Sequence, residues 1–538
     1  MEIVVPSRLL IAPPDLRTAD PTVADEIYAG FFSFDGSVVN ARGESPFALP
    51  APTSAWRRTL TGFSWLRHLR AAGTQLSREN ARALALDFAQ APRGPRADPA
   101  FEPGVLARRL SSLLAHSPLL LDGAEAAFYE VFVELLAREA RALHRHLANP
   151  PHSGGERLPL AIAFLQYCVC ADAPPGVASR GAKFFTDALE RELHPDGCPV
   201  SRNPFTLLEL LLDMLPLRQA FSGRGIYPPE ALRRALDVMI PMLRQLQHED
   251  LSLALFNGMG ETPLGRVATI FAQEDGRRGA SAEAVRGGYH RLQAGETGAI
   301  VDAGAPPPRA FSHRAHAGLL SFEYSVGLDR IVVNCGAPPA HYTAARDAAR
   351  FPAAHSTLAL EGVDAALFDA DGALVGGPTT VVAVRRLAPQ GEVLELSHDG
   401  FAARFGLRHE RSLALTQDGA RFVGEDRLVA VEGAAPRAEA TEAVVRFHLH
   451  PRVGAGFFED EHAIGLSLPG GGDILFEWSG ARACIEESVF FATASGGVKS
   501  RQIALRGPAR AGLEIRWSFE RRAVAAAPDA PVPPEADV

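Results

Sequence analysis

FSHRAHAGLLSFEYSVGLDRIVVNCGAPPAHYTAARDAARFPAAHSTLALEG, residues 311–362, is the stretch from which the fold of this chain can be worked out. It contains three short apolar runs, Leu319–Phe322, Ile331–Val333 and Thr357–Leu360, separated by Gly, Pro and Asp residues. Short runs rich in β-branched and aromatic residues between turn residues are typical of β-strands. The stretch therefore predicts a β-rich domain with short loops.

Polar residues with titratable side chains lie around these predicted strands. A single histidine is usually a packed core residue or a solvated one. Several histidines on neighbouring strands, mixed with arginines, are equally well explained by a polar site, because titratable groups gather in functional clefts. Both interpretations stay open for this group, which comprises His313, Arg314, His316, His341, Arg350 and His355.

The length and charge of the chain limit what it can be. At 538 residues it is too long for a single hydrophobic core and predicts two or more domains. Its net charge of −9 argues against a nucleic-acid partner, which would need a basic face. A cleft that takes an acidic glycan must therefore be locally basic, against the charge of the whole molecule.

Cysteine usage and the N-terminus bear on location. The five cysteines are odd in number and have neither metal-type spacing nor the pattern of a disulfide framework. The first twenty residues have no basic region followed by a long apolar segment, so no signal peptide is predicted. No apolar run reaches the ~18 residues of a membrane span. We expect a cytoplasmic protein, and a periplasmic location stays open.

The N-terminal half has a helical pattern. Residues 1–50 are rich in proline and predict an irregular arm that packs onto the body through its aromatic rings. Residues 51–275 predict a toroid-like array of helices, although no sequence repeat of fixed period is present. Apolar residues at three- and four-residue steps place helices at Thr61–Ala72, Glu125–Leu147, Asn203–Leu217 and Glu230–Leu246.

The composition changes at Gln273–Gly288, which is charged and rich in Gly and Ala. Residues 276–522 predict an antiparallel β-sandwich, and the Ala- and Pro-rich residues 523–538 predict a disordered tail. The fold class is therefore multidomain α+β, with helices first and the sandwich second. The expected strands include Tyr289–Leu292, Ala299–Asp302, Leu319–Tyr324, Val381–Arg385, Val393–Ser397, Val444–His450, Ile474–Trp478 and Leu513–Phe519.

Three motifs in the central stretch carry a resemblance to a known family. They are His316–Glu323 (HAGLLSFE), Val332–Gly336 (VVNCG) and Ala354–Gly362 (AHSTLALEG), in this order and close together. In these motifs the chain resembles the heparinase II/III-like polysaccharide lyases. The resemblance implies an N-terminal α/α toroid, a C-terminal antiparallel β-sandwich and a cleft between them.

The resemblance also places part of the site in the helical half. Asp196-Gly197, followed by Asn203 at a helix start, is similar to the family segment before the substrate-binding helix. Asn is also a good N-cap, so Asn203 has a purely structural interpretation as well. Capping and a role in the cleft are compatible with each other.

The chemistry that the resemblance implies is β-elimination at a uronic acid. The proton at C5 is acidic only when the neighbouring carboxylate is neutralised, and the departing O4 must be protonated. The implied catalytic residues are Asn203, His316, His355 and Tyr342. The implied substrate-binding residues are Arg202, Arg314, Arg350 and Asn257.

The chain departs from the family pattern at several positions. Phe205 and Thr206 stand where active members carry Tyr and His, and Arg314 replaces the first residue of a His-x-His pair. Family members that bind a metal have an Asp and a further His where this chain has Asn334 and His355. No cofactor is required, and His316, Asn334 and His355 are the candidate ligands of a divalent metal, Zn²⁺ or Ca²⁺.

Three functions remain open. The first is a lyase that cleaves a uronic-acid-containing polysaccharide or oligosaccharide. The second is a non-catalytic glycan-binding relative that has lost its proton-transfer residues. The third is another enzyme on the same scaffold, such as a hydrolase or a metal-dependent esterase, since a fold does not determine a function. The expected partner is an acidic glycan, and the oligomeric state is open, a homodimer included.

Overall fold

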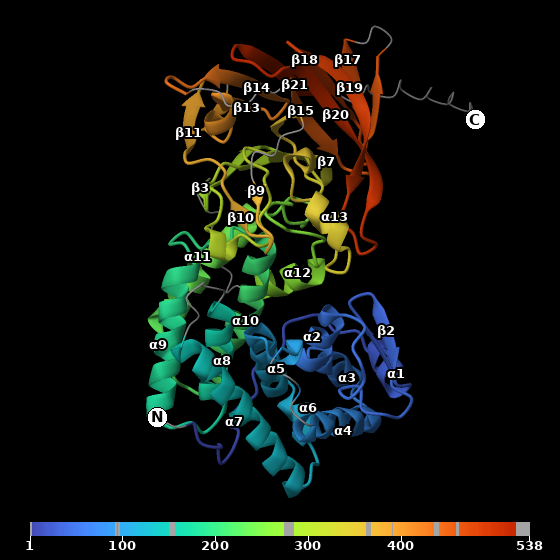
Figure 1. Cartoon of the computed structure of the whole chain (residues 1–538), viewed down its shortest axis with the longest axis vertical. Coiled ribbons are helices and arrows are strands. Elements are labelled where there is room, and N and C mark those ends of the chain that lie inside the picture. Colours follow the sequence, from blue (N-terminus) through green and yellow to red (C-terminus); the bar gives the residue numbers. More distant parts are fainter. Residues whose placement is uncertain are drawn as a thin grey trace, which may run out of the picture.

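The computed structural model describes residues 3–91, 94, 97–149, 157–273, 285–361, 367–389, 391–434, 441–458 and 462–522. Helices make up one lobe and antiparallel sheets the other, stacked along the long axis of the molecule (Figure 1). The predicted fold class, a helical toroid followed by an antiparallel β-sandwich, is confirmed. The predicted tail at 523–538 lies outside the described residues.

The helical lobe is an array of amphipathic helices. Most of them bury one apolar face, whereas twelve of the thirteen residues of α8 are buried, so that this helix lies inside the array. The array comprises α2 (Ser54–Gly62), α3 (Leu66–Ala72), α4 (Gln75–Gln90), α5 (Pro103–Ala115), α6 (Ser117–Leu121), α7 (Ala126–Ala148), α8 (Leu158–Cys170), α9 (Pro175–Glu192), α10 (Pro204–Gly223), α11 (Glu230–Gln245) and α12 (Leu264–Ala272).

Two sequence expectations in this lobe need correction. Thr61–Ala72 is not one helix, because Phe63 adopts a left-handed backbone that ends α2 before α3 begins. The first fifty residues are not irregular throughout: they contain α1 (Thr22–Tyr28) and the hairpin of β1 (Phe31–Phe34) and β2 (Ser37–Asn40). The Trp56 indole donates to the Phe32 carbonyl at 2.9 Å, which fixes this hairpin to α2.

The sandwich is built from two large antiparallel sheets. The first has the order β11-β12-β13-β14-β21-β18-β17-β16, and the second has the order β19-β20-β15-β7-β6-β5-β4-β3, with β8 paired to β15. Strands of the first sheet are β11 (Val381–Ala388), β12 (Gly391–His398), β13 (Leu407–Thr416), β14 (Arg421–Ala430), β16 (Gly454–Phe457), β17 (Ala463–Ser467), β18 (Asp473–Ser479) and β21 (Leu513–Arg522). Strands of the second are β3 (Val285–Arg286), β4 (Tyr289–Ala294), β5 (Thr297–Asp302), β6 (Phe322–Val326), β7 (Asp329–Val333), β8 (Leu358–Leu360), β15 (Glu442–Leu449), β19 (Arg482–Phe490) and β20 (Val498–Pro508).

An aromatic cluster joins the two sheets. Phe322 of β6 stacks on Trp517 of β21 with ring centroids 5.4 Å apart, and Phe447 of β15 meets the same indole edge-on at 4.9 Å. Such pairs add to the stability that burial already provides. The strand expected from Leu319 begins only at Phe322, because Leu320 has a positive φ of 56° and the chain turns there.

Smaller elements complete the fold. The loops between the large strands carry β9 (Leu367–Phe368), β10 (Leu374–Val375) and the helices α13 (Thr343–Ala348) and α14 (Ala402–Phe405). The tip of the N-terminal hairpin at Gly36 lies against the ring of His341, which precedes α13, so the two lobes also touch there. Among the described residues, no helix combines the length and hydrophobicity needed to cross a bilayer.

The two lobes are joined by a buried ion pair. Arg202, just before α10, donates to the Asp302 carboxylate at the end of β5 at 2.6 Å, and both side chains are buried. Burial alone would lower the pKa of Arg202, but the Asp302 carboxylate outweighs this effect and raises it. The guanidinium also lies over the Tyr289 ring and donates to the Gly287 carbonyl.

Asn257 extends this contact. Its amide donates to the Tyr289 hydroxyl at 2.8 Å and to Asp302 at 3.0 Å. Gly304 is required beside it, because a Cβ there would lie 2.3 Å from a nitrogen of Arg202. The lobes therefore meet through a tightly packed polar network in which each charged side chain has a partner.

Replacing Asp302 with Asn leaves the buried Arg202 without its counter-charge. We expect the free energy of unfolding to fall by about 3–5 kcal/mol, as is usual when one partner of a buried ion pair is removed. Urea unfolding followed by circular dichroism measures this loss. Glu230→Gln, in an exposed pair with Arg233, is the control and is expected to leave stability unchanged; a similar loss in both variants would contradict the prediction.

Candidate active site between the two lobes

Two histidines from the central motifs lie side by side in the sheet lobe. The rings of His316 and His355 pack edge-on with centroids 5.2 Å apart, and both side chains are buried. Gly318 makes this arrangement possible, because a Cβ at that position would lie 2.8 Å from Nδ1 of His355. The HAG and AHST motifs are thus brought together, as the sequence analysis expected.

Asn334 determines the tautomer of His355. The Asn334 Oδ1 atom accepts a hydrogen bond from the Ser356 backbone N–H at 3.0 Å, which identifies it as the amide oxygen. The same oxygen lies 3.3 Å from Nδ1 of His355 and therefore accepts a hydrogen bond from the Nδ1–H group. With its proton on Nδ1, the imidazole keeps the lone pair on Nε2.

Three polar atoms at this site are buried without a hydrogen-bond partner among the described residues. They are Nδ1 of His316, Nε2 of His355 and Nδ2 of Asn203. A buried polar group left unsatisfied costs about 1–3 kcal/mol, so such groups need an explanation. The three atoms are therefore candidates for contact with a polar ligand.

Asn203 brings the helical lobe into this site. Its Oδ1 accepts from the Phe205 backbone N–H at 2.7 Å, which makes it the N-cap of α10. Its unpartnered Nδ2 lies near Gly258, whose other neighbour is the backbone of Arg314. The two proposed roles of Asn203 are therefore compatible. Its Oδ1 atom caps the helix, and its Nδ2 atom faces the segment that leads to His316.

Burial keeps both histidines neutral. Desolvation and the neighbouring His355 hold the pKa of His316 well below its usual range. Desolvation lowers the pKa of His355 to about 4; the nearby Ala349 carbonyl opposes this shift but does not meet hydrogen-bond geometry with the ring. At neutral pH both rings are therefore uncharged, and each has one nitrogen with a free lone pair.

Three expected substrate-binding residues have structural partners instead. Arg202 and Asn257 belong to the interlobe network described above, and Asp302 occupies the guanidinium of Arg202. Arg350 donates to the carbonyls of Ala315 and Ser312, and its guanidinium stacks 3.9 Å above the Phe368 ring. Arg350 and Asn257 support the loop that carries His316, since the Asn257 Oδ1 also accepts from the His316 backbone N–H at 3.5 Å. The expected role of these three residues in substrate binding stays a prediction.

Arg314 and Tyr342 lie at the surface. Arg314 is exposed, as expected of a residue that could meet a glycan. Tyr342 is 38% exposed, and its ring lies against that of His341 with centroids 4.2 Å apart and planes tilted by 40°. The structure shows no contact between Tyr342 and either site histidine, so its expected role as a base has no geometric support.

The side chains do not fit the expected metal site. The Asn334 oxygen is taken by Ser356 and His355, and its amide nitrogen lies 3.4 Å from the Glu323 carboxylate. Within the described part of the chain, no three His, Cys, Asp or Glu side chains converge as metal ligands would. A neutral amide that is already hydrogen-bonded is a poor substitute for the usual anionic ligand.

Several supporting residues were not anticipated from the sequence. Glu323, fully buried on β6, accepts from the Asn334 backbone N–H at 2.9 Å and pairs with His248 of the helical lobe at 2.9 Å. Arg411 of β13 donates to the carbonyls of Leu320 and Ser356, within the two motif loops. Glu323 lies inside the HAGLLSFE motif, but nothing in the local sequence indicates partners so distant along the chain.

The fold and this site define a polysaccharide lyase-like protein. Residues 276–518 match the family model described as heparinase II/III-like, C-terminal. The chain is 30% identical to FtsZ-localized protein C of Caulobacter vibrioides, covering 96% of this chain and 91% of the relative. This chain belongs to the heparinase II/III-like family.

Solved structures agree with this assignment at the level of fold. The crystal structure of heparinase III superposes with a TM-score of 0.74 over 97% of this chain and 87% of that one, at 12% identity. The structure of heparan sulfate lyase HepC from Pedobacter heparinus superposes with a TM-score of 0.64. The superposition covers 97% of this chain and 86% of HepC, at 17% sequence identity. Identities this low show a shared fold, and they leave the reaction of this chain to be argued from its site.

The buried neutral state of His355 predicts a pH-dependent stability. Its pKa is about 4 when folded and 6.5 when unfolded, so the unfolded chain binds more protons between these values. This linkage lowers the free energy of unfolding by about 3 kcal/mol as the pH falls from 7 to 4. Urea titrations at several pH values measure how steeply the free energy of unfolding falls with pH. This fall should be smaller for His355→Gln than for wild type. His313→Gln, at an exposed position, should show the same fall as wild type.

Proposed function

We propose that this protein cleaves a uronic-acid-containing polysaccharide or oligosaccharide by β-elimination, in the cleft between its lobes. The observation that carries the proposal is the set of unpartnered buried atoms on Asn203, His316 and His355. They come from both lobes, and they supply the two functions that the reaction needs: a donor for the carboxylate and an acceptor for the proton.

The proposed reaction assigns a role to each atom. The Nδ2 amide of Asn203 donates to the uronate carboxylate, which makes the C5 proton more acidic. Nε2 of His355, which carries the lone pair, takes that proton. The electrons of the C5–H bond form the C4–C5 double bond, the C4–O4 bond breaks, and the protonated His355, beside the uncharged His316, returns its proton to O4 and is neutral again. The base is weak, because its pKa is about 4.

The second candidate is a non-catalytic glycan-binding protein, and one observation favours it. The Tyr289 hydroxyl, which is buried beside Asn257 in the interlobe contact, donates to the Arg202 carbonyl and accepts from Asn257. It is therefore held by the protein and is not free to move a proton. In this case the same three atoms would bind the glycan without cleaving it.

The relative named FtsZ-localized protein C suggests a setting for either activity. Because the identity of 30% extends over nearly the whole of both chains, we propose that this chain also localises with FtsZ. We keep the cytoplasmic location expected from the sequence as part of the proposal. A fluorescent fusion imaged together with labelled FtsZ tests the proposed localisation and the cytoplasmic location. A fusion signal that does not follow FtsZ would contradict the proposed localisation.

The lyase proposal predicts an unsaturated product. Wild-type protein incubated with a panel of uronate polymers should raise the ultraviolet absorbance of the C4–C5 double bond. Asn203→Ala and His355→Gln should lower the initial rate at least about hundredfold, the usual effect of losing a catalytic acid–base group. Tyr342→Phe is the control and should keep the wild-type rate.

The binding alternative gives a different pattern. A polymer that binds by calorimetry, but yields no unsaturated product with wild-type protein, would replace the lyase proposal with the glycan-binding one. A saturated product would indicate hydrolysis and exclude both.

A chelator separates the metal expectation from this mechanism. Because the Asn334 amide is already hydrogen-bonded, dialysis against EDTA should leave the rate of product formation unchanged. A loss of activity that Zn²⁺ or Ca²⁺ restores would show that the metal expectation was right and that the site rearranges around the ion.

A further inference from the structure

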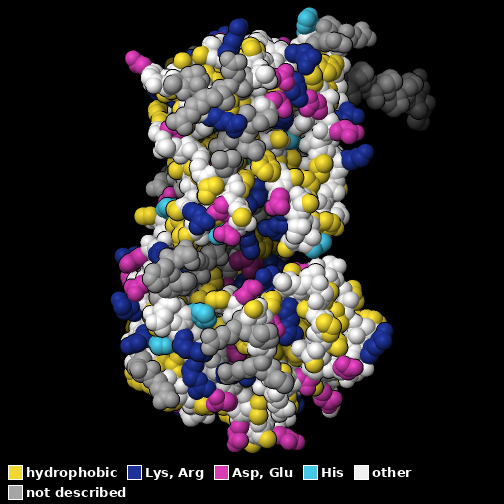
Figure 2. All heavy atoms as spheres, viewed as in Figure 1, with side chains coloured by type: hydrophobic (Ala, Val, Ile, Leu, Met, Phe, Trp, Pro, Cys, Tyr) yellow, Lys and Arg dark blue, Asp and Glu magenta, His cyan; other side chains and the backbone are white. Residues whose placement is uncertain are grey.

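A second polar pocket lies in the helical lobe beside the start of α10. Its cavity volume is about 440 Å³, and Phe205, two residues after Asn203, forms part of its wall. Figure 2 shows basic side chains gathered in the hollow between the two lobes. The charged residues that line the pocket are Arg17, Arg58, Arg67, Arg108, Arg266, Asp35 and Glu209.

Three of these arginines have a carboxylate partner at two or more of their nitrogens, and the first of them, Arg58, binds Glu102 at 2.7 and 2.9 Å. Arg17 binds Glu209 at 2.7 Å and Asp213 at 2.8 Å. Arg108 binds both oxygens of Asp213, at 2.9 and 3.0 Å. This bidentate geometry is the strong form of an arginine–carboxylate pair. Arg17 and Arg108 line the pocket, but most of their N–H donors are used by carboxylates of the protein.

Arg67 and Arg266 are not compensated in this way. The Nε of Arg67 donates to Asp15 at 3.2 Å, but its two terminal nitrogens have no hydrogen-bond partner within the described ranges. Arg266 donates one terminal nitrogen to Glu209 at 3.0 Å, while its Nε is buried without a partner. Unused guanidinium donors that face a cavity are what an anionic group requires.

The local electrostatics point in the same direction. Burial lowers the pKa of Arg67 to about 10; Asp15 opposes this shift, and the nearby Arg17, Arg108 and Arg266 add to it. The cations therefore repel one another at this point. An anion placed between them would relieve that repulsion, so the pocket favours a negatively charged ligand.

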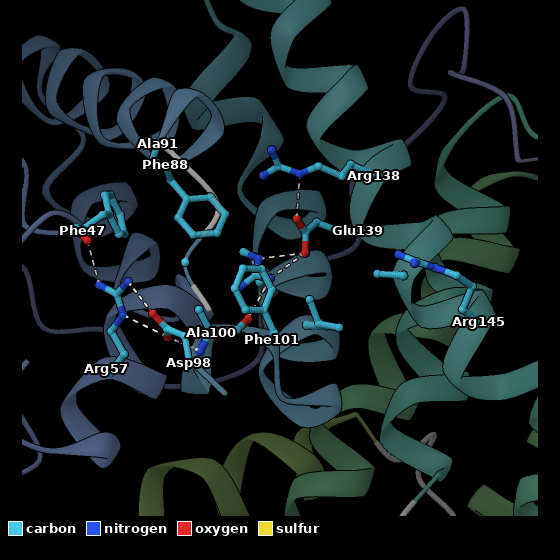
Figure 3. Close-up of a pocket in the computed structure, with 14 residues that line it drawn as sticks. Phe47, Arg57, Phe88, Ala91, Asp98, Ala100, Phe101, Arg138, Glu139 and Arg145 are labelled. Atoms are coloured by element: carbon cyan, nitrogen blue, oxygen red, sulfur yellow. Dashed lines mark hydrogen bonds and ion pairs between the residues drawn. The ribbon is translucent and has the colours of Figure 1, made fainter. Parts of the chain in front are cut away.

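The cavity in Figure 3 is a useful contrast. It also lies in the helical lobe and is lined by arginines and aromatic rings. There Arg57 pairs with Asp98 at 3.0 Å, and Arg109 with Glu139 at 2.6 Å. Arg57 and Arg109 each donate two nitrogens to one carboxylate and the third to a backbone carbonyl, so these two guanidiniums offer fewer free donors than those of Arg67 and Arg266.

We infer that the pocket of Arg67 and Arg266 is an acidic-group subsite, which holds a second carboxylate or sulfate of the glycan whose neighbouring uronate binds at Asn203. The inference rests on the proposed function and makes it more specific: the ligand is an oligomer with at least two acidic groups. The common wall at Phe205 connects the subsite with the helix start that Asn203 caps.

Calorimetry with three tetrasaccharides tests the subsite: an unsulfated uronate, its sulfated form and its carboxyl-reduced form. Arg67→Gln keeps a donor for Asp15 and removes the charge. It should raise the Kd of the acidic ligands about tenfold, as expected for the loss of one charge-assisted hydrogen bond. The Kd of the reduced ligand should not change. Arg234→Gln, at an exposed position, is the control.

The outcomes are distinct. Equal affinities in wild type and Arg67→Gln would overturn the subsite while leaving the proposed function intact. A loss confined to the sulfated ligand would assign the subsite to sulfate, and a loss for both acidic ligands would assign it to the carboxylate.

If no glycan binds the wild-type protein, the proposed function fails and a simpler probe remains. Inorganic sulfate should then raise the Tm of wild type and not that of Arg67→Gln. The absence of any difference between the two would overturn the subsite as well.

Discussion

The contact between Arg202 and Asp302 is the constraint on which the rest of this structure depends. It joins the start of α10 to the end of β5, and the Tyr289 ring and Asn257 amide close around it. Neither lobe can supply the complete site, because Asn203 belongs to one and the histidines to the other. A buried ion pair adds little net stability, but this one sets the position of one lobe against the other.

The site itself depends on a layer of buried polar residues behind it. Glu323 holds Asn334, Asn334 orients His355, and Arg411 fixes the carbonyls of both motif loops. The charges and hydrogen bonds of this layer are satisfied within the protein, whereas the atoms in front of it are not. Other buried histidines, such as His144 and His290, also have a ring nitrogen without a partner among the described residues. What distinguishes Asn203, His316 and His355 is their position in the helix-start and sheet motifs that the interlobe contact brings together.

Much of the fold could be predicted from the sequence, because helix and strand periodicity are local properties. The cap at Asn203 followed from the preference of Asn for a helix start, and the meeting of His316 with His355 from motifs that lie close together in the chain. The roles of Arg202, Arg350 and Asn257 did not, since their partners are distant residues or backbone carbonyls that only the folded chain brings near. The hairpin at Phe31–Asn40 was missed because its short strands lie within a proline-rich segment.

The contact between Gly36 and His341 has a thermodynamic consequence. Together with the Arg202 network, it holds the lobes at two separate points, so their relative position is set within the protein itself. Binding of the proposed glycan would then require little ordering of the protein, and most of the entropy lost would belong to the flexible ligand and its bound water. A longer glycan loses more of that freedom, so its affinity should rise less steeply with chain length than the number of contacts does.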